Sequence, residues 1–174
     1  MRVSPVAYLF NDLRTVQLEA RKSALPSHNS IPAIRDATAL ASTIFLARQK
    51  KTKEEIKHYI SKNYGYSLDY DLEHLQKTNI FNGSCDITVP QAIFLFLNSN
   101  DFKESIRKAI SIGGDTDTIA CMVGSISEAY YGIPKELRDK ALQVLPPAFQ
   151  KTLFDAYAVK RKRESLVKED LCLS

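Results

Sequence analysis

The segment that decides the fold is Ser111-Ile-Gly-Gly-Asp-Thr-Asp-Thr-Ile-Ala-Cys-Met-Val-Gly-Ser-Ile-Ser-Glu-Ala-Tyr-Tyr-Gly132. It begins with two glycines and a compact cluster of two aspartates and two threonines. The residues that follow are apolar or small, and Glu128 is the one charged side chain among them. This composition predicts a central, buried helix that ends at Gly132, with Cys121 in the core.

The rest of the chain has the composition of one globular domain. Of its 174 residues, 44% are hydrophobic and 25% are charged, which is ordinary for a soluble fold. The four residues Lys160–Arg163 account by themselves for the formal net charge of +4. A nucleic-acid-binding face needs basic residues spread over a surface, so we expect no nucleic-acid partner.

The cysteines and the N-terminus indicate a cytoplasmic protein. The three cysteines form no Cys-x-x-Cys pair and no Cys/His cluster, which excludes a readable zinc site and favours a reducing compartment. Residues 1–10 lack the pattern of a signal peptide, and no apolar run is long enough for a membrane span. We therefore expect no membrane partner.

Apolar residues recur at helical spacing through most of the chain, and no convincing strand appears. The spacing and the capping residues predict helices over residues 12–21, 30–47, 53–63, 69–76, 88–97, 100–110, 116–131, 135–144 and 148–170. Asn11, Ser30 and Thr88 are the expected N-caps, and Thr52 with Glu55 forms a capping box. The sequence therefore predicts an all-α domain.

The cluster after the glycines offers the ligands that a hard cation prefers. Asp115, Asp117 and Thr118 place oxygen atoms within four residues, as Mg²⁺ sites require. On a regular helix Asp115 and Asp117 do not share a face, so Asp115 must lie outside helical geometry. Gly113 and Gly114 permit this, because glycine tolerates unusual dihedral angles. A helix with an acidic cap and no metal is the alternative.

Four motifs, in this order along the chain, resemble those of the ADP-ribosylglycohydrolase family, of the dinitrogenase-reductase-activating glycohydrolase type. They are Met1-Arg-Val-Ser-Pro5, Ser27-His28-Asn29, Val89-Pro90-Gln-Ala-Ile93, and the opening segment continued through Ile133-Pro134. Four motifs in order are far more specific than any one of them.

The resemblance implies a compact, orthogonal helical bundle with a binuclear Mg²⁺ site. It implies hydrolysis of the glycosidic bond between ADP-ribose and a protein side chain or a related acceptor. Carried over to this sequence, the metal ligands are Asp115, Asp117 and Thr118. The residues expected near ADP-ribose are Arg2, His28, Gly113 and Gly114. Without the family, His28 reads as a capping or core histidine.

The sequence departs from the family in one respect. Family members carry a Thr-Asp-Asp-Thr motif and an acidic residue upstream of the Met-Arg segment, and here nothing precedes Met1. We expect a partial domain over residues 1–158, lacking the N-terminal helices, and a charged end over 159–174. Such a chain is expected to be weakly active or inactive alone, and to associate with itself or with a missing N-terminal half. A non-catalytic structural or interaction protein of the same fold is the alternative.

Overall fold

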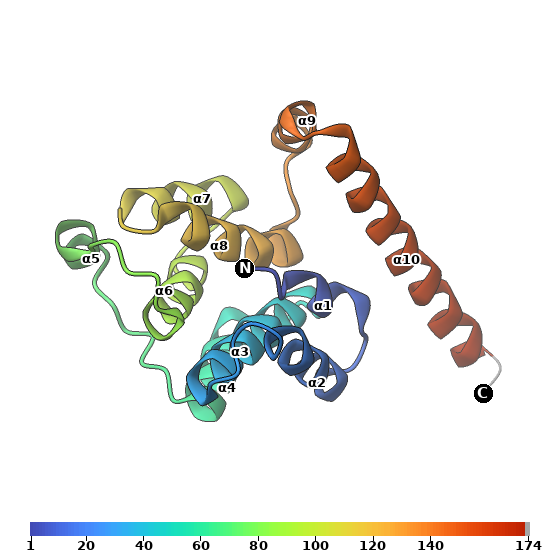
Figure 1. Ribbon diagram of the computed structural model, residues 1–174, viewed down its shortest axis with the longest axis horizontal. Helices are drawn as coiled ribbons and strands as arrows, with labels where there is room; N and C mark the ends of the chain where they lie inside the picture. Colours follow the sequence, from blue (N-terminus) through green and yellow to red (C-terminus); the bar gives the residue numbers. More distant parts are fainter. Residues whose placement is uncertain (173–174) are drawn as a thin grey trace. The chain divides into compact units, whose positions relative to one another are not determined.

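The computed structural model describes the backbone of residues 1–172 and the side chains of residues 1–160. Within these residues the chain forms ten helices and no strand, which confirms the predicted all-α fold (Figure 1). The helices are α1 (Ser4–Leu9), α2 (Leu13–Ala24), α3 (Ile31–Arg48), α4 (Lys53–Tyr64), α5 (Leu72–Thr78), α6 (Cys85–Leu97), α7 (Phe102–Ser111), α8 (Thr116–Tyr131), α9 (Lys135–Val144) and α10 (Pro147–Cys172). None of the described helices is long and apolar enough to cross a membrane.

The chain divides into two compact units, Met1–Gly132 and Ile133–Ser174. The first contains α1 to α8 and the candidate site. In the second, the Gln150 side-chain amide ties α10 to the end of α9, donating to the carbonyl oxygens of Leu142 and Leu145, both at 2.9 Å. The domain boundary that we expect after residue 158 stays a prediction. Most of the basic run after it lies outside the residues whose side chains are described.

Helices α3 and α8 form the centre of the first unit. Helix α3 packs against α1, α2, α4, α6 and α8, and helix α8 packs against α3, α6 and α7. Alanines and other small residues on α3 are completely buried and allow its neighbours to approach closely. Cys121, by contrast, is exposed on α8. Its predicted place in the core was therefore wrong, because the three packing partners of α8 leave that strip of the helix uncovered.

The N-terminal boundaries of several helices differ from the predictions, among them that of α5, which begins at Leu72 and not at residue 69. The apolar N-terminus forms the short helix α1, which has a proline in its first turn. Helix α2 is capped by Asp12, whose carboxylate accepts from the backbone N–H of Thr15 at 2.9 Å, and not by Asn11. Helix α6 begins at Cys85, one turn before Thr88, so that Pro90 lies inside it. Ser84 begins that turn because its carbonyl oxygen accepts from the N–H groups of Ile87 and Thr88.

The guanidinium of Arg48 ties α1 to the end of α3. Its Nη1 donates to the carbonyl oxygens of Ala7 at 2.8 Å and Tyr8 at 2.7 Å. Its Nη2 donates to the carbonyl oxygen of Phe10 and the side chain of Asn11, both at 2.8 Å. A cation therefore satisfies the carbonyl groups that α1 leaves open at its C-terminal end.

A second cation from the same region caps α8. Lys50 has a positive φ of 57°, alone among the described non-glycine residues. Its Nζ donates to the carbonyl oxygens of Ala129 at 3.1 Å and Tyr130 at 2.5 Å. The C-terminal ends of both α1 and α8 are thus held by residues at the end of α3, where positive charge also complements the helix dipole.

We expect Arg48→Met to lower the free energy of unfolding by about 2 to 3 kcal/mol, because several carbonyl groups lose a charged donor while the aliphatic packing is retained. Chemical denaturation followed by circular dichroism measures this change. Arg21→Met removes an exposed arginine from α2 and serves as the control, with an expected change within about 0.5 kcal/mol. Equal losses in the two variants would contradict the role assigned to Arg48.

Candidate functional site

The turn between α7 and α8 has the geometry that the sequence predicts. Gly113 and Gly114 have φ angles of 70° and 72°. The Asn79 side chain donates to the carbonyl oxygen of Gly113 at 3.1 Å, and Gln91 donates to Asn79 at 3.1 Å. A Cβ atom at Gly114 would lie 2.8 Å from Nδ2 of Asn79 and 3.0 Å from the carbonyl oxygen of Ile80. Both the φ angle and the close approach of the loop require glycine at this position.

This turn places Asp115 at the N-cap of α8, with its carboxyl group bound to no backbone N–H of the helix. The residue has φ −81° and ψ 62°, outside helical geometry as expected, and its side chain makes no capping hydrogen bond. Its carbonyl oxygen begins the helix by accepting from the N–H of Ile119 at 3.0 Å. The helix therefore does not occupy the Asp115 carboxyl group, which shares a hydrogen bond with Asp117 instead.

Asp117 lies in the first turn of α8 and is exposed. A hydrogen bond shared with the Asp115 carboxyl, together with the backbone N–H of Thr118, holds the pKa of Asp117 below its usual value. That N–H donates to Oδ1 of Asp117 at 2.7 Å. The carboxylate of Asp117 is thus ionised at neutral pH and sits beside that of Asp115.

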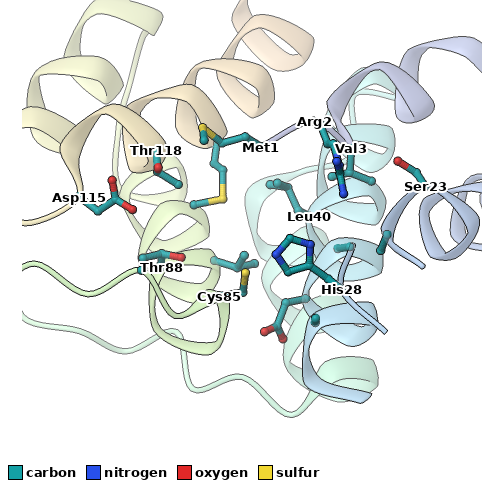
Figure 2. Close-up of a pocket in the computed structure, with 17 residues that line it drawn as sticks. Met1, Arg2, Val3, Ser23, His28, Leu40, Cys85, Thr88, Asp115 and Thr118 are labelled. Atoms are coloured by element: carbon teal, nitrogen blue, oxygen red, sulfur yellow. The ribbon is translucent and has the colours of Figure 1, made fainter. Parts of the chain in front are cut away.

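A cavity of about 390 Å³ opens in the first unit next to Asp115. Figure 2 shows Asp115, Thr118 and Thr88 on one wall, and Arg2, His28 and Leu40 on the other. The residues that line it are Met1, Arg2, Val3, Ser23, Ala24, His28, Ala33, Asp36, Ala37, Leu40, Gly83, Cys85, Thr88, Val89, Asp115, Thr118 and Met122.

The cavity brings together four of the seven predicted site residues, from three separate segments. Arg2, His28, Asp115 and Thr118 line it. Asp117, Gly113 and Gly114 do not line it, although the two glycines shape the turn that leads into its wall. Their direct roles in binding stay predictions.

Arg2 and His28 belong to one hydrogen-bonded cluster. The guanidinium of Arg2 donates to Oγ of Ser27, and that oxygen lies 2.6 Å from Nδ1 of His28. Both residues are exposed at the mouth of the cavity. This end of the cavity therefore presents a fixed positive charge, which suits an anionic group such as a diphosphate.

Sequence reasoning missed a buried acid in the cavity wall. Asp36 is 1% exposed and lies on the same face of α3 as Ala33, Ala37 and Leu40. A signal was present, because a carboxylate at helical spacing among apolar residues is seldom left without a function or a partner. Thr88 was expected only as an N-cap, but it lies inside α6, which begins earlier than expected, and Gly83 lies just before that helix.

The donor set around Asp115 suits a hard cation, but only in part. Asp115, Asp117 and Thr118 supply two carboxylates and a hydroxyl, which are oxygen ligands of the kind that Mg²⁺ takes. Among the described side chains, however, no group of three or more histidines, cysteines or acids is placed to hold a metal ion. The residues present therefore match one side of a metal site.

Comparison with known proteins decides which protein family this cavity belongs to. A sequence model of the ADP-ribosylglycohydrolase family matches residues 1–167. The chain belongs to the ADP-ribosylglycohydrolase family. The predicted resemblance is thereby confirmed, and it extends beyond the motifs into α10.

Individual relatives within the ADP-ribosylglycohydrolase family agree. The human ADP-ribosylhydrolase ARH3 is 26% identical over 180 residues, covering 76% of this chain and 49% of the relative. An uncharacterized protein of Archaeoglobus fulgidus is 30% identical over 152 residues, covering 78% of this chain and 50% of the relative. The chain thus spans about half the length of the curated relatives it matches.

A solved structure shows the ADP-ribosylglycohydrolase fold independently. The structure, titled ADP-ribosylglycohydrolase-related protein complex, superimposes with a TM-score of 0.67 at 23% sequence identity. The superposition covers 90% of this chain and 56% of the solved chain. At this identity the likeness establishes the fold, and the chemistry of the cavity is argued from its own residues.

We expect Gly114→Ala to cost more stability than Gly65→Ala. Both positions have a positive φ, of 72° and 73°, so each alanine pays about 1 to 2 kcal/mol of backbone strain. Only the Cβ at Gly114 meets the Asn79 loop, whereas nothing lies within 4 Å of one at Gly65. The difference in the free energy of unfolding, measured by denaturant titration, reports this contact, and equal losses would show that the loop yields freely.

Proposed function

We propose that this chain forms part of a Mg²⁺-dependent hydrolase that cleaves the glycosidic bond between ADP-ribose and a protein side chain or a related acceptor. The observation that carries the proposal is the single cavity that joins Arg2 and His28 to Asp115 and Thr118. Membership of the ADP-ribosylglycohydrolase family supports the reaction class. The free cysteines Cys85 and Cys121 are consistent with the cytoplasmic location that the sequence suggests.

The two walls of the cavity take different parts of the substrate. Arg2 and His28 bind the diphosphate, to which they present donors and positive charge. Asp115, Asp117 and Thr118 would hold Mg²⁺ on the side of the ribose that carries the scissile bond. A bound Mg²⁺ polarises oxygen atoms and orients a water molecule for attack. The glycine turn keeps the Asp115 carboxylate pointing to this end of the cavity.

Ligands from beyond this helix end complete the metal site in this proposal. A binuclear centre needs ligands on more than one side, and this chain supplies Asp115, Asp117 and Thr118 from one helix end. Exposed apolar side chains support an interface. Ile80 and Phe81 are 79% and 74% exposed, and they directly follow Asn79, whose side chain holds the glycine turn. These ligands come from the remainder of the family fold, in the same polypeptide or another, or from a second copy of the chain.

We expect Asp115→Asn to abolish Mg²⁺ binding measured by isothermal titration calorimetry, because the variant loses the uncapped carboxylate. Asp117→Asn is expected to weaken the binding at least tenfold, since removing one charged ligand costs more than about 1.4 kcal/mol. Asp139→Asn, on exposed α9, is the matched control and should leave the titration unchanged. If Asp115→Asn binds Mg²⁺ as the wild type does, Asp115 is not a metal ligand.

We expect the 174-residue chain alone to hydrolyse ADP-ribosylated protein slowly or not at all. Addition of an N-terminal half from a family member should raise the rate, and light scattering should show the complex. Rapid hydrolysis by the chain alone, as a monomer, would contradict the need for a partner. Failure to bind ADP-ribose even with the partner present would favour a structural role for this fold.

A further inference from the structure

The buried acid Asp36 has one carboxylate oxygen without a hydrogen-bond partner. Its Oδ1 accepts from Nε of Arg35 at 2.8 Å and from the hydroxyl of Tyr66 at 2.5 Å. Its Oδ2 is almost fully buried and has no hydrogen-bond partner among the described residues. A buried acceptor left unpaired costs about 1 to 3 kcal/mol, and more when it is charged. Because Asp36 lines the cavity, a molecule bound there could supply the missing donor.

Neighbouring side chains hold Oδ1 of Asp36 in place, and Oδ2 is the oxygen that remains for a ligand. Burial, reinforced by the hydrogen bond to Asp36, raises the pKa of Tyr66 far above its usual value, so Tyr66 keeps its proton and remains a donor. The guanidinium of Arg35 stacks over the Tyr66 ring, 5.2 Å from its centroid. Both partners therefore hold the carboxylate in one orientation, with Asp36 in the wall of the cavity.

The chemistry of the carboxylate limits which ligand groups it can receive. A carboxyl oxygen that carries no proton is only an acceptor, so a partner of Oδ2 must be an N–H or O–H donor, and an ionised diphosphate offers none. Asp36 belongs to α3, as does Leu40, which Figure 2 shows on the wall opposite Asp115 and Thr118. In the proposed function, the ribose that carries the scissile bond lies at Asp115. The donors left for Asp36 are those of the adenosine half.

We propose that Oδ2 of Asp36 accepts a hydrogen bond from the adenosine half of ADP-ribose and selects for that nucleoside. The donor is either the amino group of adenine, which other bases lack at this position, or a hydroxyl of the adenosine ribose. This inference rests on the proposed function, because it assumes that ADP-ribose occupies the cavity. It adds a specificity residue on α3 to the residues that the motifs supplied.

The test is the affinity of the full chain for ADP-ribose, measured by calorimetry in wild type and Asp36→Asn. The asparagine oxygen can still accept from Arg35 and Tyr66, while its amide nitrogen replaces the acceptor at Oδ2 by a donor. We expect binding to weaken about tenfold or more, with little change in the midpoint of thermal unfolding. Unchanged affinity in Asp36→Asn would overturn the inference.

Tyr66→Phe is the matched control. It removes a hydrogen bond to Oδ1 and leaves Oδ2 in place, so we expect lower stability with nearly unchanged affinity. Should Tyr66→Phe weaken binding as much as Asp36→Asn does, Asp36 acts by supporting the fold and the inference fails. Absence of ADP-ribose binding in the wild type would overturn the proposed function together with the inference.

Ligand analogues identify the donor without any change to the protein. Inosine diphosphate ribose lacks the adenine amino group, and a second analogue lacks both hydroxyls of the adenosine ribose. Weaker binding of the first by wild type, but not by Asp36→Asn, assigns the amino group. The same pattern with the second assigns a hydroxyl. Equal affinity of wild type for ADP-ribose and both analogues would overturn the inference even if Asp36→Asn fails to fold.

Discussion

The turn formed by Gly113 and Gly114 is the constraint on which the candidate site depends. Its two positive φ angles end α7, reverse the chain and leave Asp115 outside the helix that it caps. The Asn79 loop lies so close to Gly114 that a side chain there would overlap it. The Asn79 side chain, itself held by Gln91, also fixes the turn by donating to the carbonyl oxygen of Gly113. Because α8 follows directly, the direction of the whole helix and the position of Thr118 depend on this turn.

The cavity is assembled from parts that are stabilised separately. Asp115 and Thr118 depend on the glycine turn, whereas Arg2 is carried by the segment before α1, and α1 is held by Arg48. His28 lies in the loop before α3, and Asp36 lies on α3 itself. Helix α3 is common to these parts because it contacts α1, α2, α6 and α8. Its small, buried residues therefore serve the site as much as the core.

Local signals in the sequence were sufficient for most of the fold. Ser30 and the Thr52–Glu55 capping box begin helices where expected, because capping hydrogen bonds form within a few residues. Pro90 led to a wrong start for α6, because a proline is typical of the first turn of a helix. Here it lies further along α6. Cys121 misled because the apolar composition of α8 does not say which strip of the helix its neighbours leave open.

Site residues that belong to sequence motifs could be predicted. Those that depend on tertiary packing could not. Asp115 and Thr118 follow a recognisable glycine pair, and Arg2 and His28 belong to motifs of the ADP-ribosylglycohydrolase family. The unpaired oxygen of Asp36 is a property of the folded cavity alone, because it depends on how Arg35 and Tyr66 use the other oxygen. No spacing rule relates Asp36 to Tyr66 across thirty residues of chain.

Lys50 anchors the C-terminal end of helix α8. A small rotation about this end therefore produces a larger displacement at the N-terminal end, where Asp115 lies. The 16 residues of α8 span about 24 Å. A tilt of about 2° around the Lys50 anchor therefore displaces the acidic tip of α8 by roughly 1 Å, and errors of that size at a reacting centre lower rates strongly. Lys50 thus controls the aim of Asp115, although it lines no part of the cavity.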